Sequence, residues 1–184
     1  MYDLCETITI KDGRSVVVRS PKPGDGELVR DYLCKLGAST DFVLSFPGDI
    51  RPASAYEEHV EMALRGEFYS ISAIHPDDGS IIASTAFMMN TRVKTAHIAT
   101  LGTGVLPDWQ GAGLGKWMLD RAINDIKVNP KILKLELGVI KGNHIAQRMY
   151  ERAGFEVEGC KLKSIKQPSG VFEDEILMGM WIGQ

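Results

Sequence analysis

The sequence predicts a mixed α/β fold, in which a single domain carries helices on the faces of a β-sheet. The chain has 184 residues, 44% hydrophobic and 24% charged, which is ordinary globular composition and enough length for one well-buried core. Short alternating apolar runs predict strands, and apolar residues spaced three and four apart predict helices. These runs follow the order strands, helices, an antiparallel run, then strand-helix-strand-helix-strand-strand, which is typical of this class. Since no linker or repeat is evident, we expect one domain over residues 1–184.

The amino-terminal part is predicted to form a hairpin and two helices. Residues 7–20 alternate around a polar turn, which indicates two short strands. Residues 27–36 have helical spacing, and Gly37 is expected to end that helix. Residues 38–53 form an irregular, partly apolar loop of a length that is often functional. Ser54 is then expected to cap a second helix.

The middle of the chain reads as three strands followed by a helix and a further strand. Residues 68–74 and 80–89 are rich in β-forming side chains and are joined by a turn sequence, so they predict a hairpin. A third strand is expected over 95–106. A helix with one apolar face is expected over 113–127, and a strand over 132–139.

The carboxyl-terminal part is predicted to contain one capped helix and two strands. Asn143 is a favoured residue type at a helix start. Gly154 followed by Phe155 is typical of a glycine C-cap with its hydrophobic contact. The last two strands are expected over 155–162 and 172–181.

Charge and cysteine usage narrow the class of protein. The formal net charge of -3 gives no reason to expect nucleic acid or an anionic membrane as a partner, and it suits a small cationic substrate slightly better. The three cysteines are widely spaced without a paired CxxC motif, so we expect free thiols in a reducing compartment and no metal site. No signal sequence or run of about 18 apolar residues is present, so we expect a soluble, cytoplasmic protein.

A glycine-rich loop lies between a predicted strand and a predicted helix. Its sequence is Gln110-Gly111-Ala112-Gly113-Leu114-Gly115. A strand that leads through glycines into a helix start directs unpaired backbone N–H groups and the positive end of the helix dipole at one point, which suits a phosphate. A tight turn without any ligand explains the glycines equally well.

Two common phosphate loops do not fit this segment. A dinucleotide-binding GxGxxG that starts at Gly111 would need glycine where Lys116 stands. A nucleoside-triphosphatase loop that ends at Lys116 would need glycine at Gln110 and Ser or Thr at Trp117.

Two segments together resemble the GNAT superfamily of N-acetyltransferases. Residues 105–115 are similar to that family's acetyl-CoA motif, with Gln110, Gly113 and Gly115 at its three key positions. The run Leu135-Glu136-Leu137-Gly138-Val139, then Asn143, Ala146 and residues 150–155 resembles the second family segment. The resemblance implies the GNAT fold, with a mixed, mostly antiparallel sheet that is splayed at the coenzyme site.

The resemblance also implies acetyl-CoA as the donor and assigns its contacts. Backbone groups before the loop would pair with the pantetheine arm, and loop amides would hold the pyrophosphate, with further contacts from the second segment. The expected coenzyme-binding residues are Gly104, Val105, Gln110, Gly111, Ala112, Gly113, Leu114, Gly115, Lys116, Asn143, Ala146 and Tyr150. Capping of a helix is an alternative role for Asn143, and the two roles are compatible.

For catalysis, the resemblance implies direct attack of an amine, with Tyr150 protonating the departing thiolate. A buried core tyrosine is the alternative interpretation. The strand expected over 95–106 contains no acidic residue, so His97 is the candidate base, although a structural histidine is also common at such positions. Glu136 is interpreted as a surface charge, and the other histidines suggest no metal cluster.

The acceptor side is expected to involve Asp41 and Phe42 in the irregular loop. Asp41 could attract a cationic amine, although an exposed loop aspartate needs no such role. The acceptor is expected to be a small amine, an amino acid-like compound or a protein N-terminal amine. A non-catalytic acyl-CoA-binding sensor or interaction module is the alternative function, and a homodimer is compatible with the family.

Overall fold

The computed structural model describes residues 3–183, and within them the strands form one eight-stranded sheet with the order β1-β2-β3-β4-β5-β6-β8-β7. Neighbouring strands are antiparallel in the β1–β2, β2–β3, β3–β4, β6–β8 and β7–β8 pairs, whereas β5 and β6 are parallel. The mixed, mostly antiparallel sheet predicted from the sequence is therefore confirmed.

Contacts divide the chain into two compact units. The first comprises residues up to Met88 together with Gly102–Asp125, and the second comprises Met89–Leu101 with the residues from Ile126 onward. Strand β5 (Ile98–Val105) contributes residues to both.

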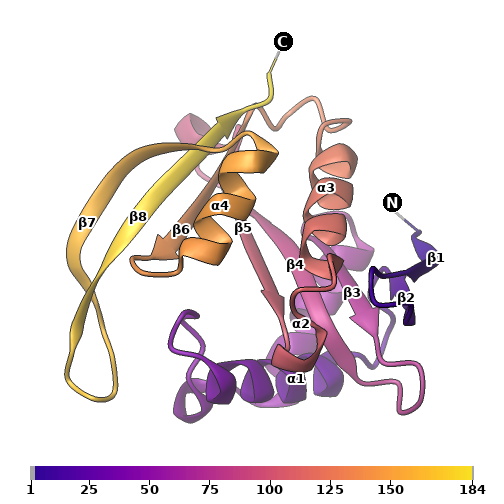
Figure 1. The fold of residues 1–184 in the computed structure, drawn as a ribbon. Helices are drawn as coiled ribbons and strands as arrows, with labels where there is room; N and C mark the ends of the chain where they lie inside the picture. The colour runs from indigo at the N-terminus through magenta and orange to yellow at the C-terminus, as the bar shows by residue number, and fades with distance from the viewer. Residues whose placement is uncertain (1–2, 184) are drawn as a thin grey trace. The chain divides into compact units, whose positions relative to one another are not determined.

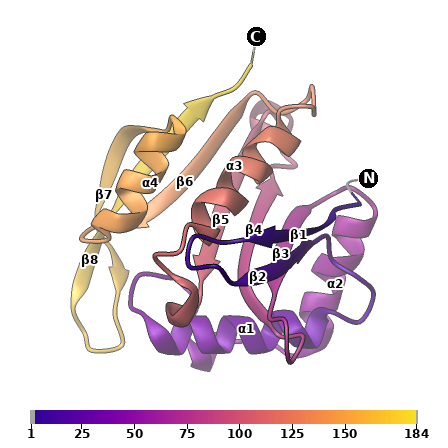
Figure 2. The same ribbon diagram turned by 45° about the vertical axis from the view of Figure 1, so that its right-hand side comes forward.

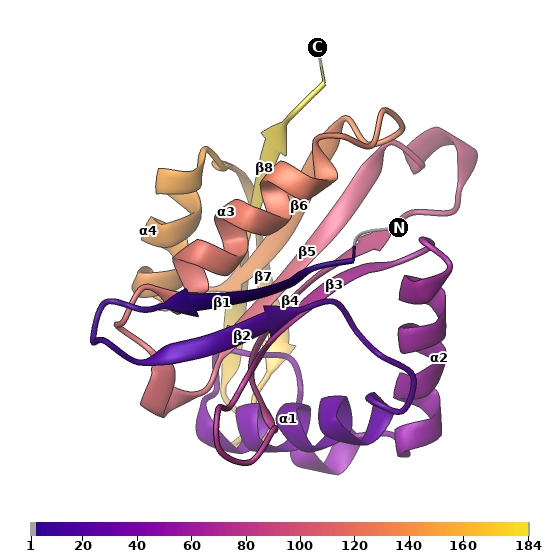
Figure 3. The same ribbon diagram turned by 90° about the vertical axis from the view of Figure 1, so that its right-hand side faces the viewer.

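The strands of the first unit begin with the predicted hairpin, whose turn contains Gly13 with a φ of 89°. Figure 3 shows this hairpin running beside β3. Both faces of the next two strands are buried, since Ile81, Ile82 and Ala83 follow one another in the core. The strands are β1 (Cys5–Thr9), β2 (Ser15–Arg19), β3 (Tyr69–Ile74) and β4 (Ile81–Met89).

The helices of the first unit are α1 (Gly26–Ser39), α2 (Ala53–Leu64) and α3 (Leu114–Ile126), and Figure 2 shows all three. Tyr32 and Leu36 of α1 pack against Ile81, which the register shift in β3–β4 brings opposite Ile74. On α3 the predicted apolar face is confirmed, because its residues are all in the core: Leu114, Met118, Leu119, Ala122, Ile123 and Ile126.

Two predicted helix ends are wrong. Helix α1 continues past Gly37 to Ser39. Gly37 lies inside the helix, where the backbone of Ser45 packs so closely that a Cβ on Gly37 would collide with the Ser45 carbonyl oxygen. Glycine is therefore required there by close packing. Helix α2 begins at Ala53 after Pro52, whose φ is -57° and whose ring sets that angle for a helix start. Ser54 lies inside the first turn, and α2 has no side-chain cap.

The second unit contains β6 (Lys134–Ile140), α4 (His144–Ala153), β7 (Glu156–Lys166) and β8 (Phe172–Trp181). Residues Ile98–Thr100 of β5 pair in parallel with residues Lys134–Glu136 of β6. Strands β7 and β8 form a long hairpin (Figure 1). Among residues 3–183 no helix is both long and apolar enough to cross a membrane.

Candidate anion-binding loop and the residues around it

The glycine-rich loop lies between a 3₁₀ turn at Pro107–Trp109 and the start of α3. Gly111 and Gly113 have φ angles of 76° and 86°, in the left-handed region that favours glycine. The side chain of Gln110 ties the loop to the preceding strand, because its Nε2 donates a hydrogen bond to the carbonyl oxygen of Val105 at 2.8 Å. The glycines are thus required by the path of the backbone itself.

Within residues 3–183, six consecutive backbone N–H groups at this loop have no acceptor. The first backbone hydrogen bond of α3 runs from the N–H of Trp117 to the carbonyl oxygen of Gly113, at 3.0 Å. For the N–H groups of residues 111–116 no acceptor is recorded anywhere in residues 3–183. Unpaired donors at a helix start, together with the positive end of the helix dipole, form a ready anion-binding site.

The turn of the β1–β2 hairpin supports this loop. The N–H of Lys11 donates to the carbonyl oxygen of Ala112 at 2.9 Å. The Lys11 stem covers Gly113, since a Cβ built on that glycine would lie 3.3 Å from Cε and 3.4 Å from Cδ of Lys11. Figures 2 and 3 both show the hairpin turn beside the amino-terminal end of α3.

Arg14 joins the same turn to the segment before the loop. Its guanidinium lies 3.9 Å from the ring centroid of Trp109 and donates to the carbonyl oxygen of Asp108 at 3.0 Å. Two further bonds reach Asp12. The hydrogen bond to Asp12 raises the pKa of Arg14, and the same bond lowers the pKa of the Asp12 carboxyl. The Arg14 guanidinium therefore has partners both in its own turn, at Asp12, and in the segment before the loop, at Asp108 and Trp109.

Neither Lys11 nor Arg14 was identified as a site residue from the sequence. The polar run around Gly13 predicts a turn, and no local pattern indicates which distant segment that turn will contact. Arg14 and Asp108 are 94 residues apart in the chain. Among the lysines, only Lys116 is near the glycine-rich loop in the sequence. The sequence therefore carries no signal that Lys11 lies beside this loop.

In the second unit, Asn143 caps α4 as predicted. Its side-chain oxygen accepts a hydrogen bond from the N–H of Ala146 at 3.2 Å. Gly154 ends the helix with a φ of 103°, and the N–H of Phe155 donates to the carbonyl oxygen of Tyr150 at 3.0 Å. A coenzyme contact of Asn143 or Ala146 stays a prediction.

Tyr150 lies on the buried face of α4. Its side chain is 6% exposed, and its ring meets that of Phe155 edge-on with centroids 5.8 Å apart. This is the packing expected of a core tyrosine, and it holds the ring in one orientation. The role of acid stays a prediction.

The expected position of His97 on a strand is wrong. A 3₁₀ turn at Val93–Thr95 occupies the start of the predicted strand, so β5 begins only at Ile98. The carbonyl oxygen of His97 accepts hydrogen bonds from the N–H groups of Leu133 and Lys134, which fixes it at the start of the parallel pair. The role of base stays a prediction for His97.

Asp41 and Phe42 lie in the irregular segment directly after α1. The N–H of Phe42 donates to Oγ1 of Thr40 at 3.2 Å, and the Phe42 side chain is 45% exposed. Leu44 and Phe46 are also exposed, so this loop presents apolar side chains at the surface. Contact with an acceptor stays a prediction for both residues.

Gly104 has a structural role that the sequence did not reveal. A Cβ at this position would lie 2.5 Å from Cδ2 of Leu36 and 2.6 Å from the hydroxyl oxygen of Tyr32. A larger residue there would therefore force the Leu36 and Tyr32 side chains of α1 to move. Elsewhere, the carboxylate of Glu136 pairs with Lys134 at 2.9 Å and is partly exposed, as expected of a charge at the surface or one that supports a site from behind.

The fold and the loop have clear relatives. The model of the acetyltransferase (GNAT) family matches residues 39–155. The L-amino acid N-acetyltransferase AaaT of Escherichia coli (strain K12) is 26% identical over 86 residues, which is 47% of this chain and 53% of that protein. The match thus spans about half the length of this curated relative.

Solved structures have the same fold. An acetyltransferase of the GNAT family from Streptococcus pneumoniae superposes with a TM-score of 0.83 at 23% identity, over 90% of this chain and 99% of that one. YncA of Salmonella typhimurium, solved with acetyl-CoA, gives 0.80 at 15% identity over 92% and 95%. The family match over residues 39–155, together with this fold, leads to one conclusion: the chain belongs to the acetyltransferase (GNAT) family.

Proposed function

We propose that this protein transfers the acetyl group of acetyl-CoA to a primary amine. The observation that carries the proposal is the row of six N–H groups over residues 111–116, which have no acceptor in residues 3–183. Such a row matches the charge of a pyrophosphate, and the loop that bears it matches the family motif. YncA, which has this fold, was solved with acetyl-CoA.

In the proposed complex the loop amides of Gly111, Ala112, Gly113, Leu114, Gly115 and Lys116 hold the pyrophosphate. Gln110 orients the loop through its bond to Val105. The backbone of Gly104 and Val105 lies along the pantetheine arm, as a neighbouring strand would. Asn143 and Ala146 contact the coenzyme in addition to forming the α4 cap.

The reaction needs a neutral amine, because the lone pair of nitrogen forms the new N–C bond as the C–S bond breaks. A lysine-like ammonium with a pKa of about 10.4 is neutral in only about one molecule per thousand near pH 7.4, whereas an α-amine with a pKa of about 8 needs much less help. The departing thiolate takes a proton from Tyr150, and the proton of the amine leaves to a base or to water. No protein nucleophile is required.

For the acceptor we favour an amine on a small molecule. The relative AaaT is named as an L-amino acid N-acetyltransferase, which supports an amino acid-like compound. A peptide N-terminal amine is the other acceptor of the same chemistry. Strand β5 contains no acidic residue that could act as a base. An α-amine fits this, because its lower pKa makes it depend less on a base than a lysine-like amine does.

A second candidate function is supported by the burial of Tyr150. A phenol that is 6% exposed and packed on Phe155 is also what a non-catalytic acyl-CoA-binding protein would retain. Such a protein would act as a sensor or interaction module without turnover.

The test of the proposal is release of free thiol from acetyl-CoA by the purified protein. The acceptor panel contains amino acids, polyamines, aminoglycosides and short peptides with free amino termini. Release with one class would establish transfer and identify the acceptor chemistry. Confirmed acetyl-CoA binding with no release across the panel would favour the sensor.

The variant Tyr150→Phe tests the acid. We expect turnover to fall by a factor of about 10² or more, since general acid catalysis typically contributes 10² to 10⁴, with acetyl-CoA affinity nearly unchanged. The ring packing on Phe155 is kept in this variant, and circular dichroism verifies that it is folded. Unchanged turnover would remove the assignment of Tyr150.

A further inference from the structure

We propose that the Lys11 side chain binds the coenzyme's pyrophosphate together with the loop of residues 111–116, so that the β1–β2 hairpin forms part of the coenzyme site. This inference rests on the proposed function. It assigns a ligand contact to a residue outside the family motif, in the amino-terminal hairpin.

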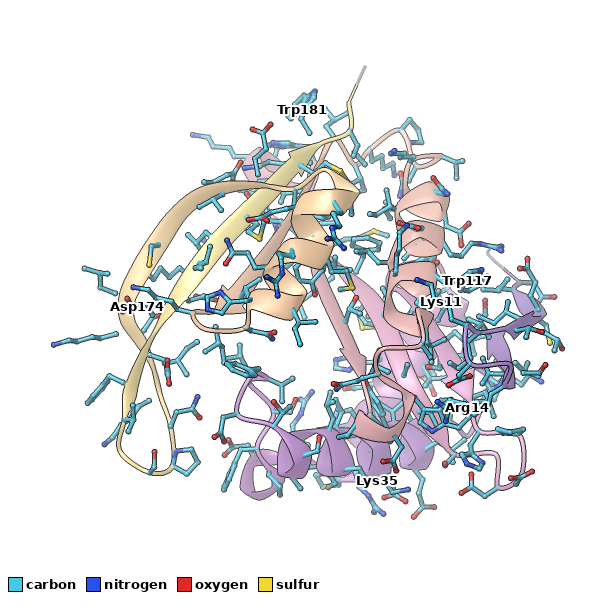
Figure 4. All side chains as sticks on the ribbon, viewed as in Figure 1. Lys11, Arg14, Lys35, Trp117, Asp174 and Trp181 are labelled. Atoms are coloured by element: carbon cyan, nitrogen blue, oxygen red, sulfur yellow. The ribbon has the colours of Figure 1, made fainter. Side chains whose placement is uncertain are left out.

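The position of Lys11 is the first support. Its backbone is hydrogen-bonded to the loop at Ala112, and its stem lies over Gly113. Because Nζ is bonded to Cε, and Cε lies 3.3 Å from the Cβ position of Gly113, the ammonium is within reach of the loop amides. Figure 4 shows the Lys11 side chain near the start of α3, the helix that carries Trp117.

The charge of Lys11 is the second support. No carboxylate of residues 3–183 lies within ion-pairing distance of its ammonium. The other nearby cations are engaged: Arg14 is bound to Asp12, and Lys116 is bound to Asp120. Of these three cations, Lys11 is the one whose charge has no carboxylate partner within residues 3–183.

The combination distinguishes Lys11 from an ordinary surface lysine. A long exposed lysine normally gains little from a fixed position and loses side-chain entropy when held. Here the apolar stem covers Gly113, and the loop below it carries six N–H donors without an acceptor in residues 3–183. Positive charge gathered beside N–H donors favours an anion at that point.

The matched variants separate the charge from the stem. Lys11→Met keeps an unbranched apolar stem over Gly113 and leaves the backbone bond to Ala112 intact, but it removes the charge. Lys11→Arg keeps the charge. Lys22→Met is the control, because Lys22 is exposed and follows the opposite end of β2.

The measurement is acetyl-CoA affinity by isothermal titration calorimetry at several salt concentrations. We expect Lys11→Met to weaken binding at least about tenfold at low salt and to show a shallower salt dependence, since one ion contact is lost. Lys11→Arg should bind within about threefold of the wild type, and Lys22→Met should be unchanged. Equal affinity of Lys11→Met and the wild type would overturn the inference.

Binding of a second ligand, dephospho-CoA, tells whether Lys11 contacts the pyrophosphate or the 3′-phosphate of the coenzyme. If Lys11 contacts the pyrophosphate, Lys11→Met should weaken binding of dephospho-CoA, which lacks the 3′-phosphate, by the same factor as it weakens binding of CoA. A loss seen only with CoA would overturn the pyrophosphate assignment. Failure of the wild type to bind acetyl-CoA would instead contradict the proposed function, so the two failures are distinguishable. Circular dichroism and thermal unfolding of each variant verify that the hairpin is intact.

Discussion

Two glycines on β5 illustrate how differently the same residue type is used. Gly102 and Gly104 are separated by one residue and both lie in the first unit. A Cβ at Gly102 would meet no atom within 4 Å, whereas one at Gly104 would enter the space of Leu36 and Tyr32. The resemblance assigned Gly104 to the coenzyme, and the close approach of α1 side chains is a second reason for a small residue there.

We expect Gly104→Ala to destabilise the protein by about 1–3 kcal/mol, because overpacking a filled site forces side chains out of their preferred rotamers. The measurement is the midpoint of urea unfolding. Gly102→Ala is the matched control and should leave stability unchanged or raise it slightly, since alanine restricts the unfolded chain more than glycine does. Equal stability of the two variants would contradict the close packing at Gly104.

At this scale the sequence predicted the loop well and the residues around it poorly. The glycines of residues 110–115 correctly predict a turn that leads into a helix, and the binding of a phosphate by its amides stays a prediction. Lys11 and Arg14 reach the loop only through tertiary contacts, which leave no local pattern. His97 was misplaced because its alternating neighbours resemble a strand, while a 3₁₀ turn precedes the actual start at Ile98.

At the scale of elements, helix ends with strong local chemistry were predicted correctly. Helix α4 begins after Asn143, whose side chain accepts a hydrogen bond from the first turn. It ends at Gly154, whose left-handed conformation is typical of a helix C-terminus. Strand β7 was predicted to end near residue 162, but it extends to Lys166 through two register shifts. Its later residues pair only because β8 supplies partners, and their own sequence lacks an apolar alternation.

The irregular part of β7 depends on Asp174 of β8 (Figure 4). Lys163 has a φ of 50°, which is uncommon for a residue with a Cβ. Its N–H donates to Oδ1 of Asp174 at 2.9 Å, and Lys141 pairs with Oδ2 at 2.9 Å. The bond from the N–H of Lys163, followed by the pairing with Lys141, lowers the pKa of the Asp174 carboxyl.

This lowered pKa predicts acid sensitivity of the hairpin. The stabilisation is fully present above the ordinary aspartate pKa of about 3.9 and is lost as pH falls through the lowered value. We therefore expect the hydrogen-exchange protection factor of the Lys163 amide, measured by NMR, to fall as pH is lowered below about 4. The variant Asp174→Asn should remove this acid dependence. The same dependence in that variant would contradict the role of the carboxylate.

At the scale of the whole molecule, the chain divides into two compact units, and we propose that they nevertheless unfold as one domain. Neither unit is a continuous stretch, since residues 89–101 of the second unit interrupt the first. Strand β5 passes from one unit to the other between Leu101 and Gly102, so one element belongs to both. Disruption of that strand in either unit should therefore disturb the other.

This proposal predicts one cooperative transition in urea. Pulse-labelled hydrogen exchange with mass spectrometry should give the same midpoint for peptides from α3 in the first unit and from α4 in the second. Small single domains usually unfold in this way. Two separate midpoints would instead identify two independently stable domains. The measurement uses the full chain, because a cut at the boundary would remove part of β5.

The discontinuity of the first unit also bears on the order in which the protein can fold during its synthesis. The hairpin leaves the ribosome before its partner, the loop at Ala112, and before α3, both of which follow only after residues 89–101 have been made. Domains commonly fold as units during translation, at about 5–20 residues per second. The hairpin must therefore wait several seconds for the loop that it supports, so the contact between Lys11 and Ala112 can form only late in synthesis.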